Sequence, residues 1–282
     1  MILLSCCENM NNLYAKDLDF KNNSNDCIII FHGFASTPYD MKNLANSLSE
    51  KGYDVYVPLL PYHGINYENL TKLDLEEAFK WGQNIIVDKR NRYEKLFLIG
   101  VSIGSAIMYV SEITNPSADV LIGLSTGGVF SWVLKFFSLI SRIIKVKYLP
   151  YTPNEDLEIK YLDEEYLTWK RKNFPKMPMD LFVQSVRISK TLNKEANKIR
   201  KPLLIINGSK DPVTSKKATS YYIKKAQNEK KLGIKIVGGK HQLLNTKYHD
   251  LVVKQILDFL YNIKFEIDPK DENFVKTIQL NS

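Results

Sequence analysis

Short apolar runs rich in β-branched residues alternate with longer segments of helical spacing along most of the 282-residue chain. This alternation is typical of a parallel sheet whose strands are connected by helices, because both faces of each strand are then covered. The predicted strands are residues 27–32, 53–57, 96–100, 120–124, 203–207 and 234–237. The predicted helices are residues 38–51, 73–90, 103–113, 215–230 and 248–263. The sequence therefore predicts the α/β class.

The strand pattern lapses between residues 127 and 200, where the sequence becomes aromatic, basic and helix-like. We predict an inserted cap or lid at 127–200, within an α/β core formed by 27–126 and 201–263. Residues 1–26 are expected to be an N-terminal extension and residues 264–282 a polar C-terminal tail.

The first part of this insertion, residues 129–146, has the pattern of an apolar helix with a narrow polar stripe. The stripe consists of Ser131, Lys135, Ser138, Arg142 and Lys145, at spacings of four, three, four and three. Such a helix either packs on the core or covers an apolar substrate.

Composition indicates an ordinary globular protein, since 44% of the residues are hydrophobic and 25% are charged. A disordered, collagen-like or disulfide-stapled chain is excluded. With 39 Lys and Arg against 31 Asp and Glu, the net charge is +8, which raises the question of nucleic-acid or membrane binding. The lysines are scattered along helices without a reading motif, so we expect a solvated face and no nucleic-acid partner.

The N-terminal sequence and the cysteines favour a cytoplasmic location. Cys6, Cys7 and Cys27 are an odd number and form no disulfide framework. The apolar start is shorter than a signal peptide, and no apolar run reaches the ~18 residues of a membrane span. As an alternative, the segment 3–6 resembles the end of a bacterial lipoprotein signal, so a longer form of the chain would be lipid-anchored or exported.

The strongest motif is Gly100-Val101-Ser102-Ile103-Gly104, which lies directly between a predicted strand and a predicted helix. This context is the one that a G-x-S-x-G nucleophile elbow requires. A serine on such a turn is exposed, and glycines two residues to either side let neighbouring backbone approach closely. The free N–H groups of the following helix point to the place where negative charge develops in acyl transfer.

A serine needs a base and an orienting carboxylate, and two loops supply candidates. His241 follows the last predicted strand, at the carboxyl edge of the sheet where open α/β sheets place their sites. Asp211 follows the strand before it. The chain order Ser102, Asp211, His241 is the order expected for nucleophile-elbow hydrolases.

A fourth element, the loop after the first predicted strand, can supply an oxyanion hole. Gly33 permits a tight turn, so that the Phe34 N–H can point to the substrate oxygen beside the N–H of Ile103. We expect His32 to brace this loop. His63 is expected in a loop with a packing role, near the mouth of the site.

Taken together, these motifs resemble the α/β-hydrolase superfamily, in particular the compact bacterial carboxylesterases and monoacylglycerol lipases. The resemblance covers most of residues 27 to 263. The matching segments are His32-Gly33-Phe34 with Ser36-Thr37-Pro38, Tyr62-His63-Gly64, the elbow at 100–104, Gly208-Ser209-Lys210-Asp211, and Gly238-Gly239-Lys240-His241 before Leu243-Leu244. Two departures are Ser105, where a second glycine is common, and Lys240 before the histidine; the cap is also longer and more basic than in compact esterases.

The resemblance implies a serine hydrolase that cleaves carboxylic esters, with Ser102 as nucleophile and Asp211 and His241 as its partners. Phe34 and Ile103 would be the oxyanion donors, with no metal or organic cofactor. The substrate is expected to be a short- to medium-chain acyl ester or a monoacylglycerol, and the apolar helix and nearby aromatic residues favour medium length. The expected pocket residues are His63, Trp132, Phe136 and Trp169.

Two other classes of function use the same residues. The site could deliver the acyl group to an acceptor other than water or act on a thioester or amide, and a protein on this scaffold could bind ligands without turnover. The intact Ser102, Asp211 and His241 argue against the last.

Four basic residues beside an apolar surface suggest weak contact with anionic lipid: Lys135, Arg142, Lys145 and Lys147. The sequence makes no prediction of the oligomeric state.

Overall fold

A mixed, mostly parallel sheet forms the centre of the computed structural model, which describes residues 13–126, 136, 138, 140–141, 145–150, 159–264 and 275–280. Among these residues eight strands pair in the order β1-β3-β2-β4-β5-β8-β9-β10, and all pairs are parallel except β1 with β3. Their bounds are β1 Leu18–Phe20, β2 Asp26–Phe31, β3 Asp54–Val57, β4 Lys95–Val101, β5 Val120–Leu124, β8 Leu203–Gly208, β9 Lys231–Ile236 and β10 Val275–Ile278.

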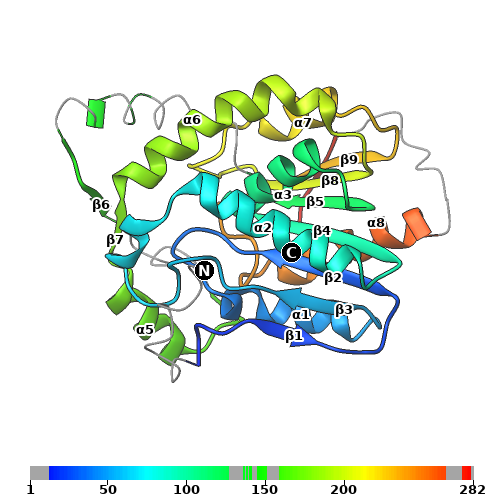
Figure 1. Cartoon of the computed structure of the whole chain (residues 1–282), viewed down its shortest axis with the longest axis horizontal. Helices are drawn as coiled ribbons and strands as arrows, with labels where there is room; N and C mark the ends of the chain where they lie inside the picture. Colours follow the sequence, from blue (N-terminus) through cyan, green and yellow to red (C-terminus); the bar gives the residue numbers. More distant parts are fainter. Residues whose placement is uncertain are drawn as a thin grey trace.

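Helices cover both faces of this sheet (Figure 1). On one face lie α1 Lys42–Ser49 and α8 His249–Lys264, and on the other α2 Leu75–Arg90, α3 Ile103–Thr114, α6 Met179–Glu195 and α7 Ala218–Lys225. Alternate residues of β2 show the consequence: Cys27, Ile29 and Phe31 pack in the α2/α3 core, while Ile28 and Ile30 pack in the α1/α8 core. Because both faces are buried, the interiors of the central strands β2, β4 and β5 are apolar. The predicted α/β class is confirmed.

The predicted helices over 38–51 and 215–230 differ from the observed ones. The first is a 3-10 turn, η1 Pro38–Met41, followed by α1; the Asp40 carboxylate accepts the Thr37 N–H at 3.1 Å and so caps this turn. The second is α7, which begins at Ala218 and ends at Lys225, because Ala226 takes a non-helical ψ of 137° and the Gln227 N–H donates to the Ile199 carbonyl. Two further 3-10 turns are η2 Asn69–Lys72 and η3 Ala196–Lys198.

Two edge strands lie outside the predicted core of the chain. β1 belongs to the predicted N-terminal extension, and β10 belongs to the predicted tail, where it extends the sheet beside β9. Both are short and only partly buried, so they lack the continuous apolar run that marks the central strands in the sequence. No strand is predicted from the sequence in the extension or the tail, but residues 18–20 and 275–278 form the two edge strands of the sheet.

The inserted segment contains a helix and a small sheet. Helix α5 Glu164–Asn173 precedes the strand β7 Lys176–Pro178, which pairs antiparallel with β6 Tyr148–Pro150. The next helix, α6, buries Leu181 and Leu192 in the core that contains α3. The second half of the predicted cap is therefore part of the helical layer of the core.

Most of the predicted helix 129–146 lies outside the described residues, including Ser131, Lys135 and Arg142. Ser138, one of the residues of the predicted polar stripe, is helical and buried. Lys145 has a positive φ of 50° in a turn, so the helix does not continue to residue 146.

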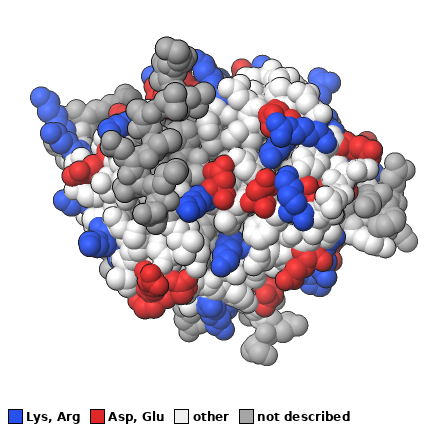
Figure 2. All heavy atoms as spheres, turned by 60° about the horizontal axis from the view of Figure 1, so that its bottom comes forward, with Lys and Arg blue, Asp and Glu red and all other residues white. Residues whose placement is uncertain are grey.

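Charged side chains are mixed over the surface. Figure 2 shows Lys and Arg beside Asp and Glu in small groups on the face that it presents. Across the described ranges, none of the helices is both long enough and apolar enough to span a bilayer.

Candidate active site

Ser102 occupies a sharp turn between β4 and α3, at the carboxyl edge of the sheet. Its backbone has φ 55° and ψ −114°, in the left-handed half of conformational space, which is unfavourable for a residue with a side chain. The turn exposes the hydroxyl above the edge of the sheet and places it at the N-terminus of α3.

Two glycines make this turn sterically possible. A Cβ atom on Gly104 would lie 2.1 Å from the Phe31 carbonyl oxygen, and one on Gly100 would lie 2.4 Å from the Ser105 Cα. Ser105, which stands where a second glycine is common, donates a hydrogen bond from its hydroxyl to the Gly100 carbonyl at 2.7 Å. The departure at Ser105 thus adds a bond across the turn.

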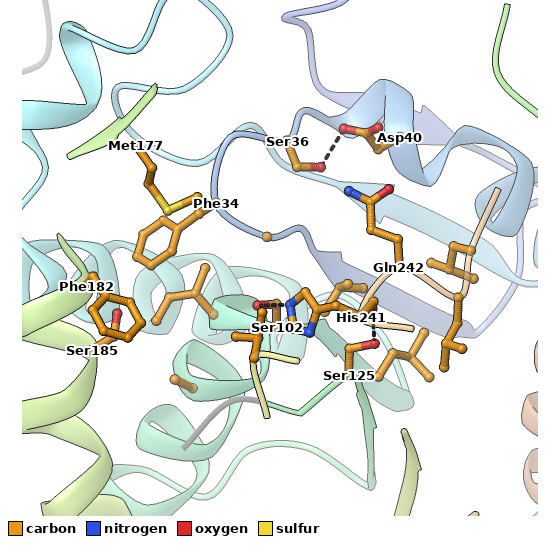
Figure 3. Close-up of a pocket in the computed structure, with 18 of the residues that line it drawn as sticks. Phe34, Ser36, Asp40, Ser102, Ser125, Met177, Phe182, Ser185, His241 and Gln242 are labelled. Atoms are coloured by element: carbon orange, nitrogen blue, oxygen red, sulfur yellow. Dashed lines mark hydrogen bonds between the residues drawn. The ribbon is translucent and has the colours of Figure 1, made fainter. Parts of the chain in front are cut away.

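The structure brings Ser102, His241 and Asp211 into one hydrogen-bonded line. Figure 3 shows the part of this line between His241 and Ser102. His241 Nε2 lies 3.0 Å from Ser102 Oγ, and His241 Nδ1 lies 2.8 Å from Asp211 Oδ2. Each residue follows a different parallel strand, so the three loops meet at one edge of the sheet. This geometry suits transfer of the serine proton to the imidazole.

The carboxylate of Asp211 is fixed and charged. Its Oδ1 accepts the N–H groups of Val213 and Thr214, at 2.7 and 3.0 Å, and its Oδ2 accepts the Thr214 hydroxyl at 2.6 Å. Burial alone would raise the pKa of Asp211, but the adjacent His241 and these hydrogen bonds outweigh burial and lower the pKa. Asp211 therefore stays an acceptor and orients the imidazole.

The two predicted oxyanion donors lie beside Ser102. Ile103 is the first residue of α3, where the N–H has no partner within the helix. Phe34 follows Gly33, where an added Cβ atom would lie 3.5 Å from the Ser102 Cβ, so this loop runs directly past the serine. Phe34, Ser102, Ile103 and His241 all line one cavity.

The arrangement matches a known family. A family model described as serine aminopeptidase, S33, covers residues 22–247. The chain belongs to this family. It also matches a putative esterase/lipase 2 of Mycoplasma pneumoniae, 26% identical over 84% of this chain and 89% of that protein.

Two further comparisons support the assignment. The match to a thermostable monoacylglycerol lipase of Bacillus sp. (strain H-257) is 29% identical but spans only 30% of this chain and 34% of that protein. A structure solved for the metagenome-derived lipolytic enzymes LipS and LipT superposes with a TM-score of 0.76, at 18% identity, over 89% of this chain and 98% of that one. The structural match confirms the α/β-hydrolase fold, and the family match over residues 22–247 confirms a hydrolase function.

Buried histidines brace the Phe34 loop in this hydrolase. His32 Nδ1 donates to the Gly33 carbonyl, and its Nε2 accepts the Leu60 N–H, both at 3.0 Å. The His63 ring contacts the edge of His32 and lies parallel to Phe34. Burial lowers the pKa of His32 to about 3, helped by His63, and burial lowers the pKa of His63 to about 4. Both rings are therefore neutral supports.

The cavity has an apolar arm and a polar end. Figure 3 shows Phe34, Met177 and Phe182 on one side of Ser102, and Ser36, Asp40 and Gln242 on another. The apolar arm is completed by Leu149, Ile188 and Leu192, and Lys170 also belongs to the polar end. Its walls thus come from the core, from β6 and β7, and from α6.

Three of the four predicted pocket residues are absent from the described lining of this cavity. His63 is buried beneath Phe34, Phe136 is 54% exposed, and Trp169 packs against Tyr14, Tyr166 and Phe174. Trp132 lies outside the described residues.

The sequence signal that could have found the apolar wall is the helical spacing of Phe182, Ser185, Ile188 and Leu192 in α6. In the described ranges no group of three or more His, Cys, Asp or Glu side chains could hold a metal ion.

Proposed function

We propose that the chain is a serine hydrolase that cleaves carboxylic esters through an acyl-enzyme intermediate. The observation that carries this proposal is the line from Ser102 Oγ through His241 to Asp211, which opens into a largely apolar cavity. The names esterase/lipase and monoacylglycerol lipase of the relatives support the ester as the bond cleaved.

In the first half of the proposed reaction, Ser102 Oγ attacks the ester carbonyl carbon as His241 Nε2 takes the hydroxyl proton. Asp211 holds Nδ1–H, so Nε2 is the nitrogen with a free lone pair. The oxyanion accepts the N–H groups of Phe34 and Ile103, each of which can lower the barrier by roughly 3 kcal/mol.

Collapse of the tetrahedral species breaks the bond to the alcohol oxygen, which receives the proton from His241. The acyl group then remains on Ser102 as an ester. A water molecule attacks this ester with His241 again as base, and the acid leaves as Ser102 regains its proton. The chain's own residues supply every proton transfer.

The cavity favours an apolar acyl group of medium length, from an ester or a monoacylglycerol. The apolar arm offers contacts to the methylene groups of an acyl chain, from Met177, Phe182, Ile188 and Leu192. Each methylene group that is buried there stabilises binding by about 0.8 kcal/mol. We expect octanoate esters to be cleaved faster than acetate esters. A preference for acetate esters would contradict this part of the proposal.

The family description raises an aminopeptidase as a second candidate, but the cavity argues against it. An aminopeptidase must hold the charged amino terminus of its substrate, usually with a free carboxylate. Among the described residues lining the cavity the carboxylate is Asp40, and the Lys170 ammonium already neutralises it. We expect p-nitrophenyl octanoate to be cleaved and amino-acid p-nitroanilides to be left intact.

The test of the proposed chemistry is labelling with a fluorophosphonate, which reacts with an activated serine. We expect peptide mapping to find the label on Ser102, and p-nitrophenyl octanoate hydrolysis to fall in proportion to labelling. A folded protein that resists the probe would instead support a binding protein without turnover.

Product analysis with a competing alcohol distinguishes hydrolysis from acyl transfer. The cytoplasmic location stays a prediction, which cell fractionation tests.

A further inference from the structure

A buried polar cluster lies on the cavity wall, and the proposed mechanism does not use it. Its centre is the carboxylate of Asp40 in η1. The Lys170 ammonium lies 2.8 Å from Oδ1 and 2.9 Å from Oδ2. The hydroxyls of Ser36 and Tyr166 donate to Oδ2 at 2.6 and 2.7 Å, and the Thr37 N–H donates to it at 3.1 Å.

The charges of this cluster are satisfied within the protein. Burial would raise the pKa of Asp40, but Lys170 and the hydrogen bonds from Ser36 and Tyr166 hold it below its usual range. Both side chains of the ion pair are almost fully buried, at 3% and 6% exposure. Since the two charges cancel, the Asp40–Lys170 pair is better suited to holding the segments that carry it in a fixed arrangement than to attracting a charged substrate.

Asp40 joins three segments that are distant in the sequence. Ser36 and Thr37 belong to the loop that carries Phe34, whereas Tyr166 and Lys170 come from α5 of the inserted segment. The backbone carbonyl of Asp40 accepts the Asn245 side-chain amide at 2.7 Å, four residues after His241. Figure 3 shows Ser36 and Asp40 on the same side of the cavity as Gln242, in the His241 loop.

The Phe34 loop needs such support because of its backbone. Ala35, next to Phe34, has φ 49°, a left-handed conformation that is unfavourable for alanine and persists only where surrounding contacts enforce it. Ser36 and Thr37, which follow directly, are the loop residues bound by Asp40. The Thr37 hydroxyl also contacts the Tyr166 hydroxyl at 3.1 Å.

We propose that Asp40, Lys170 and Tyr166 are positioning residues, which hold the Phe34 N–H in place for the oxyanion and make ester cleavage depend on the docking of α5. This inference rests on the proposed ester hydrolysis. It assigns to the inserted segment a part in the chemical step, in addition to its contribution to the cavity wall.

The test uses two variants of the full chain. Asp40→Asn combined with Lys170→Met removes the ion pair without leaving one buried charge unpaired. Tyr166→Phe removes only a hydroxyl and keeps the ring packing against Tyr14 and Tyr39. The kcat for p-nitrophenyl octanoate is measured per active site, with the sites counted by complete fluorophosphonate titration.

The second readout is the Ki of an alkyl trifluoromethyl ketone. Addition of Ser102 Oγ to its carbonyl, with the proton passing to His241, gives a hemiketal oxyanion that needs the same N–H donors. We expect the double variant to lose about tenfold to a hundredfold in kcat and to raise Ki by a similar factor, with KM changed less than about threefold. Tyr166→Phe should show a loss of about threefold or more in the same direction.

The matched control is Arg171→Ala on the same helix, which removes an exposed ion pair with Glu164 and should leave both constants unchanged. A merely structural role would lower the number of titrated sites but leave kcat per site and Ki as they are, and that result overturns the inference. If the double variant does not fold, an unchanged kcat and Ki in Tyr166→Phe overturns it. If the protein without any substitution cleaves no ester, that result instead contradicts the proposed function.

Discussion

At the scale of single residues, the proposed chemistry depends on side chains that each stand directly after a strand. Ser102, Asp211 and His241 are predictable from sequence because the ends of parallel strands meet at one edge of a sheet. Their hydrogen-bond distances depend on how three loops pack, which no local pattern contains. The role of Asp40 is hidden in the sequence for the same reason, since its partners lie up to 205 positions away in the chain.

The neutral histidines under Phe34 predict a loss of stability in acid. The pKa of His63 is about 4 in the folded protein and about 6.5 when unfolded, so the unfolded state binds more protons as the pH falls below 6.5. Stability is therefore full above pH 6.5 and falls toward pH 4. One such histidine accounts for about 2 kcal/mol between pH 7 and pH 5.

Urea unfolding of the unchanged protein and of His63→Gln, at pH 7 and pH 5, measures this effect. We expect the variant to be less stable at pH 7, because it loses the contacts with His32 and Phe34. It should lose about 2 kcal/mol less than the unchanged protein between the two pH values. An equal loss in both proteins would contradict the neutral state of His63.

At the scale of secondary-structure elements, central strands are predictable and edge strands are not. The strands β2, β4, β5 and β8 are buried on both faces, so each contains an apolar run of at least three residues. Strands β1, β6, β7 and β10 have three or four residues and depend on partners supplied by distant segments. In the sequence, 129–146 is a candidate for the apolar cover of the substrate, and most of this segment lies outside the described residues. Among the described residues α6 forms the apolar wall, and its role is hidden in the sequence because only tertiary packing distinguishes helices of similar apolar spacing.

Helix α6 is expected to determine which acyl chains fit. Phe182 contributes its ring to the apolar arm, so Phe182→Trp should fill part of the arm and shift the preference toward shorter acyl groups. We expect the ratio of kcat/KM for octanoate over butanoate p-nitrophenyl esters to fall about tenfold.

Val186→Ile is the matched control, since Val186 lies one turn further along α6 and is absent from the described cavity lining. Its ratio should stay within about twofold of the unchanged protein. An unaltered preference in Phe182→Trp would show that the acyl chain does not occupy this arm.

At the scale of the whole molecule, the chain carries a net charge of +8, and charges of both signs are mixed on the face that Figure 2 presents. Lys145 and Lys147 are exposed, whereas Lys135 and Arg142 lie outside the described residues. Lys145 and Lys147 lie directly before β6, which contributes to the cavity wall. Contact of these lysines with anionic lipid therefore stays a prediction.

Vesicles containing anionic lipid should then raise the turnover of a long-chain ester several-fold over neutral vesicles, and added salt should remove the gain. Lys145→Glu combined with Lys147→Glu should abolish the gain while leaving hydrolysis of soluble p-nitrophenyl esters unchanged. If turnover depends on neither vesicle charge nor ionic strength, lipid contact is contradicted and the net positive charge of the protein serves solubility alone.

The turn that carries Ser102 packs closely against β2, since a Cβ atom on Gly104 would lie 2.1 Å from the Phe31 carbonyl oxygen. A variant that tests Ser102 as the nucleophile must therefore leave this packing unchanged. Ser102→Ala removes one hydroxyl and leaves this packing intact. Ser111→Ala, on the same helix α3 and away from the cavity, is the matched control.

The decisive measurement is therefore hydrolysis of p-nitrophenyl octanoate by these two variants at equal concentrations of folded protein. We predict that Ser102→Ala loses at least about a thousandfold in kcat/KM and that Ser111→Ala stays close to the unchanged protein. Full activity in Ser102→Ala would contradict the proposal that this serine is the nucleophile.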